Sequence, residues 1–135
     1  MKKFNRENIN NRDALDELMQ GSGVVVIENV YSLDKINEAR LIVNHFADTQ
    51  KQKESHFNAE AEATGKIKLQ QRVWNLFGKG EIFSYLITED IIFTLMSKLL
   101  GTEFFCGSYC ASRLLPGSLG QELHIDYPYW DFYNA

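Results

Sequence analysis

A histidine and an aspartate stand two residues apart near the end of the sequence, in the stretch QELHIDYPYW. In a β-strand, residues at i and i+2 project from one face with their Cα atoms roughly 6.6 Å apart. The imidazole of His124 and the carboxylate of Asp126 would then reach adjacent positions on one metal ion. Two histidines and one carboxylate around open positions are typical of non-heme Fe(II) oxygenases. The spacing therefore indicates half of a metal site.

The other two histidines of the chain are weak candidates for a further ligand. His45 lies beside core residues of a helical pattern, and His56 lies in the unpatterned polar stretch KQKESHFNAEAEATGK. We interpret both as bystanders. A half-exposed strand with a surface His–Asp pair would also explain His124 and Asp126. The dipeptide alone therefore leaves both interpretations open.

The composition excludes several classes of protein. The 135 residues are 44% hydrophobic and 13% aromatic, which is enough for one globular core, so we expect a single domain over residues 1–135. The formal net charge is −4 and the basic residues are scattered, unlike those of a nucleic-acid-binding protein. No apolar run follows the N-terminal basic residues or approaches the roughly 20 residues of a membrane span. We expect a cytoplasmic protein without a nucleic-acid or membrane partner.

Cys106 and Cys110 lie in the strand-like stretch FFCGSYC. In a regular strand their Cα atoms are roughly 13 Å apart, whereas a disulfide needs them within about 7 Å. The same distance argues against joint ligation of zinc. We expect reduced thiols that pack as small apolar residues.

The first half of the chain predicts two helices around one strand. Residues 13–20 have a helical pattern, with Leu15, Leu18 and Met19 on one side, closed by Gly21. Residues 23–30 form an apolar run typical of a strand that is buried on both faces. Ser32 is a candidate N-cap for the longest helix, whose apolar stripe is Ile36, Ala39, Val43, Phe46 and Ala47. The polar residues 50–66 then predict the helix end and a mobile loop or lid.

The middle of the chain predicts one strand and two further helices. Residues 66–76 alternate between apolar and polar side chains, which is strand periodicity. Residues 81–87 predict one or two helical turns. Thr88 is a candidate N-cap for a further helix that ends at Gly101.

The end of the chain is rich in β-forming residues. Residues 103–115 and 121–127 read as antiparallel strands, joined by the turn PGSLG, and the second carries the His-x-Asp pair. Helices followed by consecutive strands predict an α+β fold.

Several of these segments resemble the phytanoyl-CoA dioxygenase family of Fe(II)- and 2-oxoglutarate-dependent oxygenases. They are GVVVIENVYSLDKINEAR, RVWNLFGKG, KLLG and LLPGSLGQELHIDYPYW, in that order, and together they span most of the chain. The most specific part is Pro116, Gly117 and Gln121 followed by Leu123, His124 and Asp126.

The resemblance implies helices packed on the first strands of a double-stranded β-helix, a jelly roll of the cupin type. It also implies that His124 and Asp126 are two ligands of Fe(II), with 2-oxoglutarate as cosubstrate and a small organic or acyl substrate. The second histidine and a basic residue for 2-oxoglutarate come later in that family. We therefore expect them beyond Ala135, and expect this chain to be an N-terminal fragment that is inactive alone. Asp126 favours a hydroxylase, because related halogenases carry a small residue there.

Two further residues are candidates for binding 2-oxoglutarate under this resemblance. Gln121 precedes His124 by three positions and is either a neighbour of the cosubstrate or a structural residue of the turn. Arg72 shares a strand face with Lys68 in the alternating pattern and would meet an anionic cosubstrate, unless that face is simply solvated.

Two other classes of protein stay open. A non-catalytic jelly-roll binding or interaction module would use the same aromatic residues without a metal. A zinc or manganese enzyme of the cupin type would use His124 with other ligands. A jelly roll cut after its first strands would leave unpaired edges, so we also expect a homo-oligomer.

Overall fold

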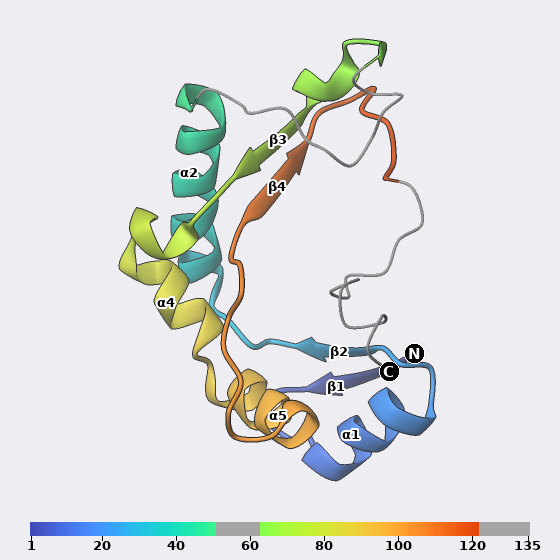
Figure 1. Cartoon of the computed structure of the whole chain (residues 1–135). Helices are drawn as coiled ribbons and strands as arrows, with labels where there is room; N and C mark the ends of the chain where they lie inside the picture. Colours follow the sequence, from blue (N-terminus) through green and yellow to red (C-terminus); the bar gives the residue numbers. More distant parts are fainter. Residues whose placement is uncertain (51–62, 122–135) are drawn as a thin grey trace. The chain divides into compact units, whose positions relative to one another are not determined.

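The structure is a computed structural model that describes residues 1–50 and 63–121 (Figure 1). The chain divides into two compact units: Met1–Gln50 with Val73–Ala111, and Lys51–Arg72 with Ser112–Ala135. The α+β class predicted from the sequence is confirmed. Within the described residues the strands form two two-stranded sheets, β1–β2 and β3–β4, and no closed barrel. The jelly roll and the single domain therefore stay predictions.

The first unit begins with a parallel β-α-β arrangement (Figure 1). Strand β1, Lys2–Asn5, pairs with β2, Val25–Glu28, with Lys2 opposite Val25 and Asn5 opposite Glu28. Helix α1, Asn11–Gln20, connects them, because parallel strands need a long crossover. The prediction that residues 23–30 are buried on both faces is wrong, since Val24 is 50% exposed and Val25–Glu28 are at best half-buried. In the described part of the chain β2 pairs with β1 alone.

Helix α1 matches the predicted helix and begins two residues earlier. The Asn10 side chain caps it by accepting a hydrogen bond from the Arg12 amide at 2.9 Å, and the Gly21 amide closes it on the Glu17 carbonyl. The predicted apolar side is only partly correct, because Met19 is 70% exposed while Ala14 and Glu17 are buried.

Helix α2, Leu33–Thr49, begins as predicted after Ser32, whose side chain accepts a hydrogen bond from the Lys35 amide. Its Ala39 and Ala47 are buried in the main core of the first unit. Helix α4, Glu81–Ile87, packs against α2, and the 3-10 helix η2, Leu76–Lys79, precedes it. The buried core consists of Ala39, Ala47, Val73, Leu76, Ile82 and Phe83.

Helix α5, Asp90–Leu100, follows α4 directly and ends at Gly101, as predicted. The predicted N-cap is wrong: Glu89 is the N-cap, and the Thr88 hydroxyl donates to the Ser84 carbonyl at 2.8 Å. Thr88 therefore closes α4. The Glu89 carboxylate instead accepts a hydrogen bond from Arg6 Nε at 2.8 Å, which ties the end of β1 to the start of α5.

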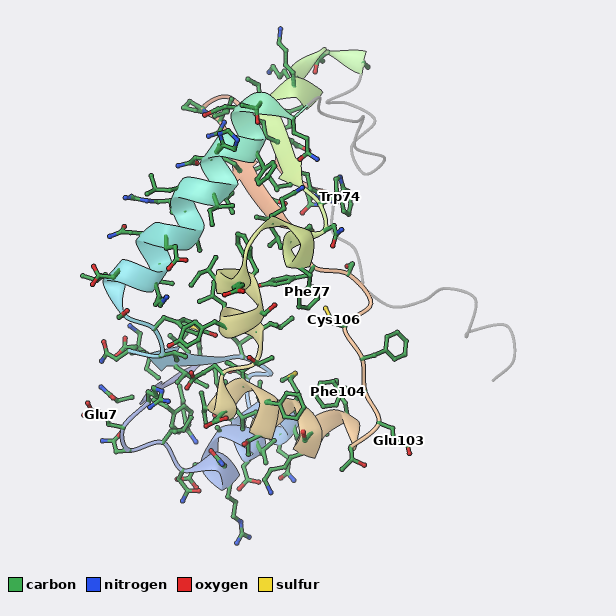
Figure 2. All side chains as sticks on the ribbon, turned by 90° about the vertical axis from the view of Figure 1, so that its left-hand side faces the viewer. Glu7, Trp74, Phe77, Glu103, Phe104 and Cys106 are labelled. Carbon is green, nitrogen blue, oxygen red and sulfur yellow. The ribbon has the colours of Figure 1, made fainter. Side chains whose placement is uncertain are left out.

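Residues 102–110 form no strand, which corrects the prediction for residues 103–115 (Figure 2). Phe104 packs on Phe93 of α5 with 5.3 Å between ring centroids, whereas Phe105 is 88% exposed. Cys106 is exposed and Cys110 is half-buried, and both are free thiols. The prediction of reduced thiols is confirmed, but Cys106 does not pack as a core residue.

The second unit contains most of an antiparallel pair (Figure 1). Strand β3, Gln70–Val73, lies beside β4, Ala111–Leu114. The predicted strand over residues 66–76 is too long. Gly65 has a φ of 69° and leads into the 3-10 helix η1, Lys66–Leu69, whose own turns use the backbone groups that a longer strand would pair.

Candidate functional site

The two predicted metal ligands, His124 and Asp126, lie outside the described residues, as does His56. Within residues 1–50 and 63–121, no group of three or more His, Cys, Asp or Glu side chains is placed to hold a metal ion. His45 is exposed on α2, where its ring packs edge-on against Phe46 at 5.3 Å between centroids. The described residues thus supply no complete ligand set, and the metal site stays a prediction.

The turn that precedes the His-x-Asp segment is described. The Ser118 amide donates to the Leu115 carbonyl at 3.0 Å, and Gly117 has a φ of 85°. Proline at the second position and a positive φ at the third are the requirements of a type II turn, which Pro116 and Gly117 satisfy. The turn predicted from PGSLG is therefore confirmed.

Two hydrogen bonds fix this turn against the start of β3. The Leu115 amide donates to the Leu69 carbonyl at 2.9 Å, before the turn. After the turn, Gln70 Nε2 donates to the Leu119 carbonyl at 2.8 Å. Gln70 is a positioning residue that sequence reasoning missed, although it stands on the polar side of the alternating pattern. The chain is thus held on both sides of the turn that leads to the His-x-Asp segment.

Gln121 follows this turn and is exposed, outside any regular element of the described residues. The hydrogen bonds that hold the turn come from the main chain and from Gln70. A role for Gln121 beside 2-oxoglutarate stays a prediction.

Arg72 lies in β3 and is half-buried, whereas Lys68 is exposed on η1. The shared strand face predicted for these two cations is wrong, because the strand begins only at Gln70. A second guanidinium was missed: Arg113 of β4 donates from Nε to Gln71 Oε1 at 2.6 Å. Since neighbouring strand residues point to opposite faces, Arg72 and the Gln71–Arg113 pair lie on opposite faces of the β3–β4 pair.

The most perturbed carboxylate lies in the first unit. Glu17 is 9% exposed and accepts hydrogen bonds from the Ser22 hydroxyl at 2.7 Å and the Ser22 amide at 3.2 Å. Lys2 Nζ is 3.4 Å from its other oxygen. The bonds from Ser22, with a contribution from Lys2, lower the pKa of Glu17 to about 2. This carboxylate is ionised and occupied by partners within the unit, so its role is structural.

Comparison of the chain with protein-family models, with curated proteins and with solved structures finds no match. The similarity to phytanoyl-CoA dioxygenases therefore rests on the sequence segments themselves. In the described part of the chain, every helix is too short or too polar to cross a membrane.

Proposed function

We propose that the chain belongs to an Fe(II)- and 2-oxoglutarate-dependent oxygenase that hydroxylates a small organic or acyl substrate, with a fold of the jelly-roll type. His124 and Asp126 are two of its three protein ligands. The observation that carries the proposal is the type II turn at Leu115–Ser118, which is fixed against β3 and ends six positions before His124.

The fixed turn lies shortly before the predicted ligands in the sequence. The Leu119 carbonyl, five residues before His124, accepts a hydrogen bond from Gln70 Nε2 at 2.8 Å. A metal bound there is carried by a segment whose start has a defined position. Defined positions are what ligand geometry requires, because metal sites tolerate only small displacements.

The β3–β4 pair offers cations for an anionic cosubstrate. Guanidinium groups bind carboxylates through paired hydrogen bonds. Arg72 lies on β3, and Arg113 lies on β4, the strand that leads into the turn. Because they lie on opposite faces, only one of them can face a given metal site. Arg72 is our first candidate, and Arg113 is the alternative on the other face.

Each residue of the site has a definite task under this proposal. Bound Fe(II), with 2-oxoglutarate and O₂, supplies the oxidising power for attack on a C–H bond. His124 must be a neutral imidazole and Asp126 an ionised carboxylate to serve as ligands. The remaining ligand comes from outside the described residues.

Anaerobic calorimetric titration of Fe(II), with 2-oxoglutarate present, tests this proposal. His124→Ala and Asp126→Ala should each weaken Fe(II) binding by at least about tenfold, which is the lower range for disturbing a metal site. His45→Ala is the matched control, because His45 is exposed on α2, and it should bind as the unchanged protein does.

Equal Fe(II) affinity in all three variants and the unchanged protein would contradict the metal site. Absence of metal binding in every sample is expected of the non-catalytic binding module and equally of an oxygenase fragment that lacks its third ligand. Tight Zn(II) or Mn(II) binding that is indifferent to 2-oxoglutarate would favour the cupin-type alternative.

A further inference from the structure

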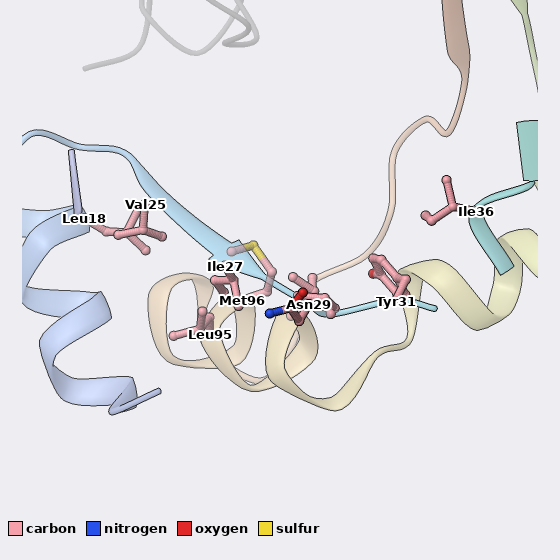
Figure 3. Close-up of a pocket in the computed structure, with 10 residues that line it drawn as sticks. Leu18, Val25, Ile27, Asn29, Tyr31, Ile36, Leu95 and Met96 are labelled. Atoms are coloured by element: carbon pink, nitrogen blue, oxygen red, sulfur yellow. The ribbon is translucent and has the colours of Figure 1, made fainter. Parts of the chain in front are cut away.

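The first unit contains a pocket that the proposed oxygenase site does not use. It has a volume of about 480 Å³ and is lined by residues of α1, β2, α2 and α5, together with the segment that follows β2 (Figure 3). Pockets that bind small molecules have volumes of about 300–1,000 Å³ and are mostly apolar. The size of this pocket therefore fits a small molecule.

Regular periodicity builds two walls of the pocket. Val25 and Ile27 are two residues apart on β2, so they share one face, and Asn29 follows the end of the strand. On α5, Ile92, Leu95 and Met96 follow the i, i+3, i+4 spacing of one helical stripe. The pocket is thus formed by rigid elements, which favours a preformed shape.

The lining selects against charge. None of the ten lining residues is acidic, basic or a histidine, and eight of them are Leu, Ile, Val or Met. A charged ligand would lose its hydration without gaining a partner in such a pocket, and this loss is costly. The pocket therefore favours an uncharged ligand.

One polar group is placed to orient a ligand. Among the lining residues only Asn29 and Tyr31 have polar side chains, and the Tyr31 hydroxyl donates to the Leu86 carbonyl. Asn29 has a φ of 62°, a left-handed conformation that asparagine tolerates better than most residues. Asn29 is an exposed residue of the pocket lining, and its carboxamide is drawn beside the apolar lining residues (Figure 3). A ligand with one hydrogen-bonding group would match this arrangement.

The apolar residues of β2 also favour an apolar ligand in the pocket. Val25, Val26 and Ile27 belong to a continuous apolar run, yet they are only half-buried. The face that carries Val25 and Ile27 is the one that opens into the pocket. An apolar molecule there would remove this surface from water, which is the main driving force for such binding.

We propose that this pocket binds an uncharged, mainly hydrocarbon small molecule that carries a single hydrogen-bonding group directed at Asn29. The binding does not depend on the proposed metal site. It would persist in His124→Ala, so failure of one proposal leaves the other intact.

Two fluorescent probes test the charge selectivity. N-phenyl-1-naphthylamine is neutral, and 1-anilinonaphthalene-8-sulfonate has the same aromatic body with an added sulfonate. The neutral probe should bind saturably at one site, with at least tenfold higher affinity than the sulfonate. Equal or tighter binding of the sulfonate would overturn the proposal.

Variants on one helix locate the probe. Met96→Trp fills the pocket and should lower the affinity for the neutral probe at least tenfold. Phe93→Trp is the matched control, because Phe93 is on the same helix, 53% exposed and not part of the lining. Asn29→Gly keeps the left-handed backbone without strain and should lower the affinity about threefold to tenfold, as expected for one neutral hydrogen bond. Unchanged affinity in Met96→Trp would overturn the proposal.

A measurement on the unchanged protein tests the proposal without relying on a variant that could fail to fold. Methyl resonances in two-dimensional ¹H–¹³C spectra should shift on titration with the neutral probe for Leu18, Val25, Ile27 and Leu95, which line the pocket. The methyl groups of Leu76 and Ile82, in the main core, should not shift. The reverse pattern, or the absence of shifts, would contradict the proposed site.

Discussion

The parallel pair β1–β2 and the antiparallel pair β3–β4 differ in how their neighbouring charges are used. Beside β1–β2, the Glu17 carboxylate takes two hydrogen bonds from Ser22 and an ion pair from Lys2, all within the first unit. On β3–β4, the Arg113 guanidinium donates a hydrogen bond across the pair to the neutral side-chain amide of Gln71 at 2.6 Å.

This difference distinguishes Glu17, a carboxylate with a structural role, from the strand pair that belongs to the proposed oxygenase site. A carboxylate that is saturated by internal partners stabilises its surroundings but offers little to a ligand. Under the proposed function, the β3–β4 pair carries two arginines for an anionic cosubstrate, and the turn after β4 positions the segment that comes next. Substitutions in the two regions should therefore differ in whether they affect binding as well as stability.

Gly21→Ala should have the largest effect on stability, with a loss of about 1–3 kcal/mol for a steric clash in a packed site. A Cβ at Gly21 would lie 2.7 Å from Glu17 Oε2 and 2.8 Å from the Glu17 carbonyl oxygen. Urea denaturation measures the free energy of unfolding. Fe(II) affinity should stay unchanged.

Gly107→Ala is the control for Gly21→Ala, because its Cβ would meet no atom within 4 Å and its φ is not positive. We expect a change within about 0.5 kcal/mol there, as for ordinary surface positions. Equal losses of unfolding free energy in the two variants would show that Gly21 is not tightly packed against Glu17.

Gly117→Ala should cost about 1–2 kcal/mol, for a different reason. Its Cβ would meet Leu69 at an ordinary 3.8 Å, so the cost comes from the φ of 85° rather than from a clash. Because the turn leads to His124, this variant should also weaken Fe(II) binding, which Gly21→Ala should not do.

Gly120→Ala is the matched control for the turn, since Gly120 has no positive φ and an added Cβ would meet no atom within 4 Å. It should keep both stability and Fe(II) affinity. Unaltered Fe(II) binding in Gly117→Ala would separate the turn from the metal site and remove the main support for the proposed function.

The sequence predicted the elements whose signals are local. Helix α2 begins after Ser32, because a serine N-cap and an apolar stripe are both contained in the segment itself. The turn at Pro116 and Gly117 was equally predictable, since proline and glycine encode its backbone angles directly.

The sequence failed where an element depends on a distant partner. Strand β1 has the polar sequence KKFN and exists because β2 lies beside it. Thr88 can cap a following helix or close a preceding one, and only the structure shows that it closes α4. Gln70 likewise gained its role from Leu119, which is 49 positions away. The predicted ligands His124 and Asp126 lie outside the described residues and stay predictions.

Gln70→Ala should have a smaller effect on stability, about 0.5–1.5 kcal/mol, which is typical of one neutral hydrogen bond. The variant removes the donor to the Leu119 carbonyl but leaves the turn's own Ser118–Leu115 bond in place. We expect Gln70→Ala to weaken Fe(II) binding more than its small loss of stability would suggest, because Gln70 positions the segment after the turn. Gln20→Ala, at the exposed end of α1, is the control and should change neither quantity. A loss of stability without any loss of Fe(II) affinity would assign Gln70 a purely structural role.

The smallest effect should come from Lys2→Ala, and it should depend on pH. The pKa of Glu17 is lowered from 4.5 to about 2, chiefly by the hydrogen bonds from Ser22, so its ionised form stabilises the folded state. That contribution is fully present above pH 4.5 and is lost as the pH falls from 4.5 towards 2.

Lys2 is an exposed partner of Glu17, so its removal should lower the melting temperature at pH 7 by less than Gly21→Ala does. The difference between Lys2→Ala and the unchanged protein should shrink as Glu17 becomes protonated near pH 2. Lys98→Ala, on the exposed side of α5, should show no such pH dependence. A difference for Lys2→Ala that stays constant down to pH 2 would mean that Lys2 acts through packing rather than through the Glu17 carboxylate.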